Sequence, residues 1–281
     1  MNPFGQIALS EGPPQYVGWT PASLGGVPKI WLNDSSAVTD AGAGACSQWN
    51  DVSGNANHFV QGTGAARPLI QLLALNNRRT IKFNGTSHFM ELTSNLAVFQ
   101  NVTSASIGVV WKKNPTGVSA ADRWIFHAPT NVNGNSRFTL LAGSTTDGDL
   151  PQARLRRLDA DTAATLNMNN ASDGNYHLTL FTMDYTNRPG TFYQDGATDN
   201  SNATLTTAGS TSNTASQTRI AIGAHADATK WGGIEIAELF ILTGYIPTGG
   251  ERDKIAGYFA WMWGLQSLLP GGHPYKSVAP T

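Results

Sequence analysis

The nine-residue run IEIAELFIL, from Ile234 to Leu242, is apolar on both faces except at Glu235 and Glu238. A strand with one face in water alternates polar and apolar residues, whereas a strand that is apolar on both faces is buried on both. The run therefore predicts the central strand of a layered β structure.

Shorter strand-like runs, separated by clusters of Gly, Asn, Asp and Ser, fill most of the chain around this strand. In one of them Ile107, Val109 and Trp111 share a face, as in a strand with one buried side. The stretch 199–216 is almost wholly Ser, Thr, Asn, Ala and Gly and predicts a long exposed loop. The expected strands are 29–32, 48–51, 58–61, 80–84, 89–92, 105–112, 123–127, 137–142, 153–158, 176–185, 191–194, 219–223 and 234–242.

One helix is expected near the C-terminus. Thr248 and Glu251 have the spacing of a capping box, and Gly264 stands where a left-handed glycine ends a helix. Apolar residues at helical spacing lie between them, and the aromatic segment AWMWGLQSLLPGGHPYK (260–276) completes this region. We expect 248–281 to form a clasp that covers an edge or a face of the strands, rather than a ligand platform or a membrane anchor.

The composition limits the class of protein. The 281 residues include 30 glycines and only 13% charged residues, which is typical of a turn-rich all-β domain. The net charge of −1 indicates neither a nucleic-acid surface nor an anionic-membrane surface, and the single cysteine excludes an internal disulfide framework. We expect no signal peptide and no membrane insertion, because no N-terminal h-region and no apolar run of about 20 residues is present.

Residues 1–28 are expected to form an irregular arm ahead of a single sandwich domain at 29–281. Five prolines interrupt any regular element, yet the arm carries Phe4, Tyr16 and Trp19. These aromatic residues either pack across their own domain or dock onto a neighbouring subunit, and the second alternative predicts an assembly contact.

Catalytic and metal motifs are weak. Glu235 and Glu238 are three residues apart, so a regular strand would place them on opposite faces and no catalytic pair is predicted. Asp34, Asp51 and Asn55 fall near strand ends and are candidate oxygen ligands for calcium, although Asp and Asn are also common turn residues. No other cofactor is predicted.

A loop before the central strand is the candidate glycan site. Lectin sites combine an aromatic face with polar groups on loops. His225, Asp227, Lys230 and Trp231 offer that combination within nine residues ending at Gly233. Trp231 could equally cover the edge of the core.

Three stretches carry a resemblance to a known family. They are IWLND (30–34) with QWNDVSGNANH (48–58), then IKFNGT (81–86), and finally IAEL (236–239) with WGL (263–265) and HPY (273–275). Together they resemble the concanavalin A-like or laminin G-like sandwich domains of tailed-bacteriophage virion and bacterial surface proteins. The resemblance covers nearly all of 29–281, and Ala56 stands where those domains usually have glycine. It implies a jelly-roll sandwich of two antiparallel sheets that serves recognition or structure without catalysis.

The resemblance and the arm together favour a non-enzymatic accessory protein of a tailed-phage virion, in a capsid decoration, collar or tail. Its expected partners are other virion proteins and host-surface glycans, and it is expected to be a homo-oligomer. The alternative is a carbohydrate-binding module or adhesin of a bacterial surface system. A glycan-degrading enzyme is the third hypothesis.

Overall fold

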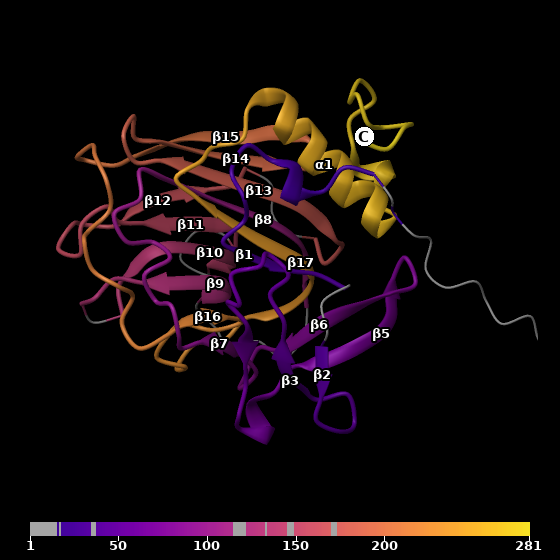
Figure 1. The fold of residues 1–281 in the computed structure, drawn as a ribbon, viewed down its shortest axis with the longest axis horizontal. Coiled ribbons are helices and arrows are strands. Elements are labelled where there is room, and N and C mark those ends of the chain that lie inside the picture. Colours follow the sequence, from indigo (N-terminus) through magenta and orange to yellow (C-terminus); the bar gives the residue numbers. More distant parts are fainter. Residues whose placement is uncertain are drawn as a thin grey trace, which may run out of the picture.

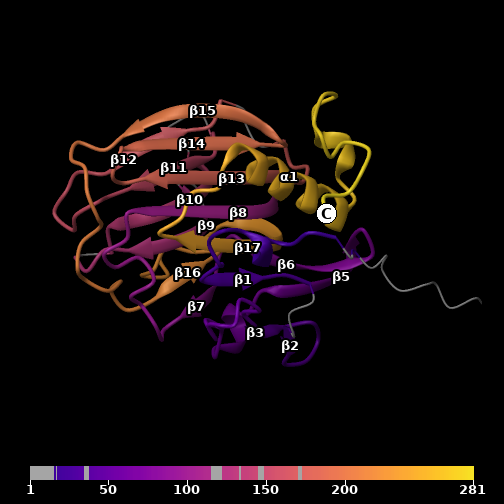
Figure 2. The ribbon, with the colours of Figure 1, turned by 45° about the horizontal axis from the view of Figure 1, so that its top comes forward.

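The computed structural model describes residues 16, 18–34, 38–114, 122–132, 134–144, 149–169 and 173–281, with the backbone alone at 122, 144 and 202–204. Two antiparallel sheets face each other, and one α-helix lies outside the first sheet (Figures 1 and 2). The predicted two-sheet sandwich with a C-terminal helix is confirmed over these residues. None of the described helices is both long and apolar enough to span a bilayer.

The first sheet has eight strands, and the strand that contains the apolar run 234–242 lies in its interior. In spatial order the strands are β15 (Ala197–Thr204), β14 (Pro189–Gln194), β13 (His177–Asp184), β8 (Ser104–Lys113), β17 (Gly233–Thr243), β6 (Arg78–Asn84) and β5 (Leu69–Leu75), and β1 (Ile30–Leu32) also pairs with β17. The residues Gly233 to Leu242 are all buried, because β17 has strands on both edges and packed side chains on both faces.

The second sheet has nine strands. In spatial order they are β12 (Ala164–Asn167), β11 (Gln152–Leu155), β10 (Ser136–Ser144), β9 (Asp122–Pro129), β16 (Ile220–Ile222), β7 (Met90–Leu92), β4 (Phe59–Val60), β3 (Cys46–Trp49) and β2 (Val38–Asp40). The short 3-10 helices are η1 (Pro21–Ser23), η2 (Gly64–Ala66) and η4 (Gln266–Leu268).

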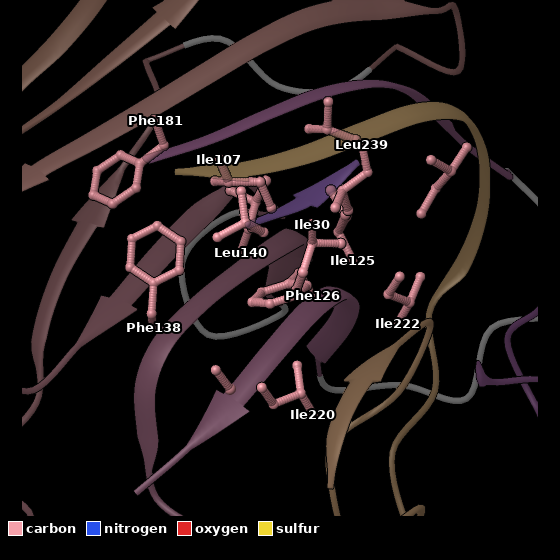
Figure 3. Packing of buried hydrophobic residues seen from close by; sticks show 14 of the residues in the cluster. Ile30, Ile107, Ile125, Phe126, Phe138, Leu140, Phe181, Ile220, Ile222 and Leu239 are labelled. Carbon is pink, nitrogen blue, oxygen red and sulfur yellow. The ribbon is translucent and has the colours of Figure 1, made fainter. Parts of the chain in front are cut away.

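The main core fills the space between the two sheets. Phe138 and Leu140 of the second sheet face Ile107, Phe181 and Leu239 of the first (Figure 3). A second apolar cluster lies on the other side of the first sheet, where Phe240 packs against Phe259 of the helix at 5.6 Å between ring centroids. The first sheet is therefore the middle layer of three.

A β-bulge in β17 brings Glu238 to the same side of the first sheet as Glu235. The register against β8 shifts between Ile236 and Glu238, so one extra residue is inserted there. Glu235 bonds to Thr80, and Glu238 bonds to Trp31 and to the helix, all on the outer side of the first sheet. The expectation that the glutamates occupy opposite faces is wrong, because it assumed a regular strand.

The helix α1 (Gly249–Trp263) has the predicted ends. Thr248 is the N-cap of a complete capping box with Glu251, and Gly264 ends the helix with a left-handed φ of 70°. Hydrogen bonds between Tyr245, Thr248 and Glu251 bring the pKa of the Glu251 carboxyl down to about 2, although its partial burial opposes this. Its charge therefore stays at the positive end of the helix dipole.

Replacing Thr248 by alanine is expected to lower the free energy of unfolding by about 1 kcal/mol, because the backbone N–H of Glu251 loses its acceptor. Thr248→Ser retains the hydroxyl and is the matched control. Urea unfolding of both variants measures the effect. Equal losses in both variants would show that the cap hydroxyl contributes nothing.

The described part of the N-terminal arm packs on its own domain. The ring of Tyr16 meets that of Tyr258 edge-on at 5.4 Å, and Trp19 lies 6.3 Å from the same ring. The backbone N–H of Trp19 and the hydroxyl of Tyr16 both donate to the carbonyl of Pro280 at 3.0 Å. Tyr16 and Trp19 are therefore engaged within the chain, as in the packing alternative, and Phe4 lies outside the described residues. The division at residue 28 stays a prediction.

The sequence patterns missed four strands, namely β2, β5, β12 and β15. The expected exposed loop at 199–216 is wrong in its first part, since β15 extends to Thr204. This strand is the edge of the first sheet and has few apolar residues, so its pairing with β14 leaves no periodic signal. The edge strand β5 has the opposite character, with Leu72 and Leu73 more than two-thirds exposed.

Candidate functional site

A hollow of about 470 Å³ opens on the outer face of the second sheet, over β9 to β12 and the loop before β17. Residues on the inner face of these strands, such as Leu155 and Leu166, belong to the core. The intervening residues point outward and line the hollow. The lining residues are Trp124, Gly134, Asn135, Ser136, Arg154, Arg156, Ala163, Thr165, His225 and Lys230.

Three aromatic rings form the base of one side of this hollow. The centroid of the Trp124 ring lies 4.7 Å from those of His127 and of His225, and the two imidazole rings stack with 4.3 Å between their centroids. Burial, reinforced by the neighbouring His225, holds the pKa of His127 well below its ordinary value. Its Nδ1 accepts a hydrogen bond from the backbone N–H of Ala226, so the neutral ring carries its proton on Nε2. The His127 ring at this base is therefore neutral.

Two polar atoms of this base have no acceptor among the described residues. They are Nε1 of Trp124, a side chain only 2% exposed, and Nε2 of the fully buried His127. Buried donors are normally satisfied, so unpaired ones often mark the place of a water or a ligand. Trp124 itself lines the hollow.

Two arginines, Arg154 in β11 and Arg156 directly after it, line the hollow. Arg154 and Arg156 alternate with the core residues Ala153 and Leu155, which places both guanidinium groups on the outer face. The guanidinium of Arg154 lies 6.0 Å from the centre of the Trp124 ring. Arg156 donates from Nε to the carbonyl of Asp161 and from Nη1 to that of Ser136.

The structure brings together two of the four predicted glycan-site residues. His225 and Lys230 line the hollow, and their backbones close the loop through a hydrogen bond of 2.9 Å. Asp227 lies at the adjacent rim, where its Oδ1 is 2.7 Å from Nδ1 of His225. Hydrogen bonds from Thr229 and His225 outweigh the effect of burial and bring the pKa of Asp227 down to about 2. Trp231 does not line the hollow; it forms a bridge with Ala224.

The sequence analysis missed Trp124, Arg154 and Arg156 as candidate site residues. A signal was present, because arginines at i and i+2 in a strand share one face. The pattern does not say which strands lie next to this face, and the hollow needs residues from positions 124, 154 and 225 at once.

The candidate calcium ligands are engaged by protein donors instead. Asp34 accepts hydrogen bonds from the side chain and backbone N–H of Arg79 and also pairs with Arg78. Asp51 accepts from the backbone N–H groups of Trp31, Ser53 and Asn57, so it shapes the turn after β3.

Asn55 belongs to the same turn as Asp51. Its amide donates to the carbonyl of Pro28. The next residue, Ala56, has a φ of 55°, a conformation that suits the glycine usual in the resembling domains. Within the described ranges no group of three or more His, Cys, Asp or Glu side chains could hold a metal ion.

Neither glutamate of β17 faces an open cleft. Glu238 is fully buried under α1, where it accepts hydrogen bonds from Trp31, Tyr258 and Trp263. Glu235 is 4% exposed and bonds to the hydroxyl of Tyr176 at 2.6 Å and to Nζ of Lys112 at 3.2 Å. The structure gives both carboxylates internal partners.

The two sheets and the helix define an antiparallel β-sandwich with a helix on its outer face, and solved structures share this fold. No protein-family model and no curated protein matches the chain. The ligand binding domain of botulinum neurotoxin serotype D, solved with N-acetylneuraminic acid, superposes with a TM-score of 0.55 at 13% identity, over 84% of this chain and 52% of that one. The binding domain of Paraclostridial Mosquitocidal Protein 1 superposes with a TM-score of 0.54 at 13% identity, over 84% and 55%. This chain therefore spans about half of each of these structures, and the likeness concerns the fold alone.

Proposed function

We propose that this chain is a non-enzymatic, lectin-type domain that binds glycans in the hollow over β9 to β12. The observation that carries the proposal is the convergence of Arg154, Arg156, His225 and Lys230 around the buried Trp124, whose indole N–H has no acceptor among the described residues. Ligand sites are concave and combine a rigid base with a few polar groups that fix orientation. Sugars offer many hydroxyls to such groups.

Two further observations support the proposal. The two superposed structures are a ligand binding domain and a binding domain, and the first of them is in complex with N-acetylneuraminic acid. The acidic pair of β17, the nearest approach to a glycosidase pair in the sequence, is shielded beneath α1 and by Tyr176, Thr80 and Lys112. A carboxylate must reach the glycosidic bond to act in hydrolysis, so binding without turnover fits this arrangement better.

Filling the hollow with an indole tests this function. Thr165 lines the hollow and is exposed, so Thr165→Trp is expected to weaken binding on a glycan array about tenfold or more without unfolding the domain. Thr39→Trp places the same side chain on an exposed position of β2, at the far end of the same sheet, and is expected to leave binding unchanged. Absence of binding to every glycan, or equal binding by the wild type and Thr165→Trp, would refute the proposed site.

We also propose, from the sequence resemblance, that this domain serves in a tailed-phage particle as a capsid decoration, collar or tail component. Tyr16 and Trp19 are engaged within the chain, so an assembly contact would use other surfaces, such as the exposed Leu72 and Leu73 of β5. Other virion proteins as partners and a homo-oligomeric state belong to this proposal, and a carbohydrate-binding module or adhesin of a bacterial surface system is the alternative for the same fold. Mass spectrometry of purified particles would test the virion role, and a protein absent from them would contradict it.

A further inference from the structure

We infer that the hollow over β9 to β12 selects a sugar that carries a negative group, a carboxylate or a sulfate ester, over a neutral sugar. The inference rests on the proposed function and specifies its ligand class.

The hollow is cationic in a protein that is nearly neutral. Arg154, Arg156 and Lys230 line it, and none of the described lining residues is an Asp or a Glu. The whole chain has a net charge of −1, so the positive charge is local. A concave site lined by charges of one sign concentrates the opposite charge.

The two arginines are held in place before a ligand arrives. Arg154 lies over the Trp124 ring, and Arg156 is fixed by two backbone carbonyls, those of Ser136 and Asp161. A planar guanidinium matches the two oxygens of a carboxylate or sulfate, and such charge-assisted hydrogen bonds are stronger than neutral ones. Preorganised donors also lose less side-chain entropy on binding.

The base of the hollow gives a neutral sugar little to bind. Neutral sugars are commonly held by stacking their C–H groups on an exposed aromatic face. Trp124 is only 2% exposed, and its neighbours are His127, His225 and the guanidinium of Arg154. Polar contacts must therefore supply the binding energy, and charged donors favour an anion.

The two described carboxylates closest to the hollow have hydrogen-bond partners outside it. Asp227 at the rim is already paired with His225 and Thr229. Asp161 directs its backbone carbonyl to Arg156, while its carboxylate accepts from the backbone N–H of Leu158. A second hollow, beside the β14–β15 turn, is lined by Asp173, Asp195 and Asp199 and would repel an anion. Selectivity is thus expected at one place on the molecule.

Calorimetric titration with matched sugars tests the inference. Sialyllactose and sulfated lactose are each compared with lactose, and at least one of the acidic sugars is expected to bind about tenfold more tightly than lactose. The two acidic ligands distinguish a carboxylate from a sulfate as the negative group. The preference is expected to decrease as salt rises, because charges in an open hollow are screened.

Charge-neutralising variants locate the effect. Arg154→Gln and Lys230→Gln are expected to weaken binding of the acidic sugar at least about fivefold and to weaken lactose binding less, so that the preference for the acidic sugar falls. Lys230 is exposed, so its substitution will not unfold the domain, and Lys82→Gln on the exposed face of β6 is the matched control. Equal affinity for acidic and neutral sugars would overturn the inference and leave the proposed function intact. Failure to bind any sugar would instead refute the proposed function.

Discussion

Replacing Trp263 by alanine is expected to lower the free energy of unfolding by about 3–5 kcal/mol, the range for truncation of a buried aromatic side chain. Trp263 is fully buried in the cluster between α1 and the first sheet, and its Nε1 donates to Oε2 of Glu238 at 2.7 Å. The substitution leaves a large cavity and also removes one donor from a buried carboxylate. Thermal and urea unfolding would measure the loss.

Two controls separate these contributions. Trp263→Phe keeps a six-membered ring in place and removes the indole N–H with part of the ring volume, so its smaller loss is an upper limit for the hydrogen bond. Leu72→Ala removes a large apolar side chain that is 72% exposed and is expected to change stability by less than about 0.5 kcal/mol. A shift near zero in Trp263→Ala would contradict the role of the C-terminal helix as a clasp.

Replacing Glu238 by alanine is expected to destabilise the fold by about 3 kcal/mol or more, because three buried donors lose their acceptor. Oε1 accepts from Nε1 of Trp31 at 2.6 Å and from the Tyr258 hydroxyl at 2.8 Å, and Oε2 accepts from Trp263. These donors come from β1 and α1, so Glu238 connects the start of the sandwich with its end. Glu91→Ala, which removes a partly exposed ion pair with Arg219, is expected to cost less than about 1 kcal/mol.

The same carboxyl makes stability depend on pH. Burial raises the pKa of Glu238 to about 7, against the three hydrogen bonds that favour its ionised form. The folded state therefore holds the proton more tightly than the unfolded state, whose pKa is about 4.5. Protonation of Glu238 therefore favours the folded state. This contribution to the free energy of unfolding is fully present below pH 4.5 and is lost as the pH rises to about 7, and the total loss is at most about 3 kcal/mol.

Glu238→Gln isolates this dependence, since the amide does not titrate. The stability of the wild type relative to Glu238→Gln is expected to fall between about pH 4.5 and pH 7. Melting temperatures measured across that interval check the trend. Parallel curves for the two proteins would show that Glu238 does not change its protonation on unfolding.

Predictions from capping motifs and side-chain periodicity were correct where residues close together in the sequence determine the structure. Thr248, Glu251 and Gly264 fix the ends of α1 through contacts within a few residues, so both ends could be predicted. The two-sided apolar run of β17 predicted a central strand for a similar reason. Prediction failed at the edge strand β15, which is stabilised mainly by pairing with β14 and not by an apolar pattern of its own.

The candidate site could be predicted only in part. His225 and Lys230 lie in one loop with site-like composition, whereas Trp124, Arg154 and Arg156 join them from β9 and from β11 and its end. Residues separated by many positions in the sequence become neighbours only through strand order, which no single strand encodes.

The class of fold, the central strand and the capped helix could be predicted from the residue pattern, because side-chain periodicity and capping are local properties. The face of the sheet on which Glu238 lies, and its hydrogen-bond partners, depend on the tertiary structure. One inserted residue turned Glu238 to the same side as Glu235, where Trp31, Tyr258 and Trp263 surround it. The cationic hollow also depends on the tertiary structure, because charges on separate strands act together only when packing brings them within reach of one ligand.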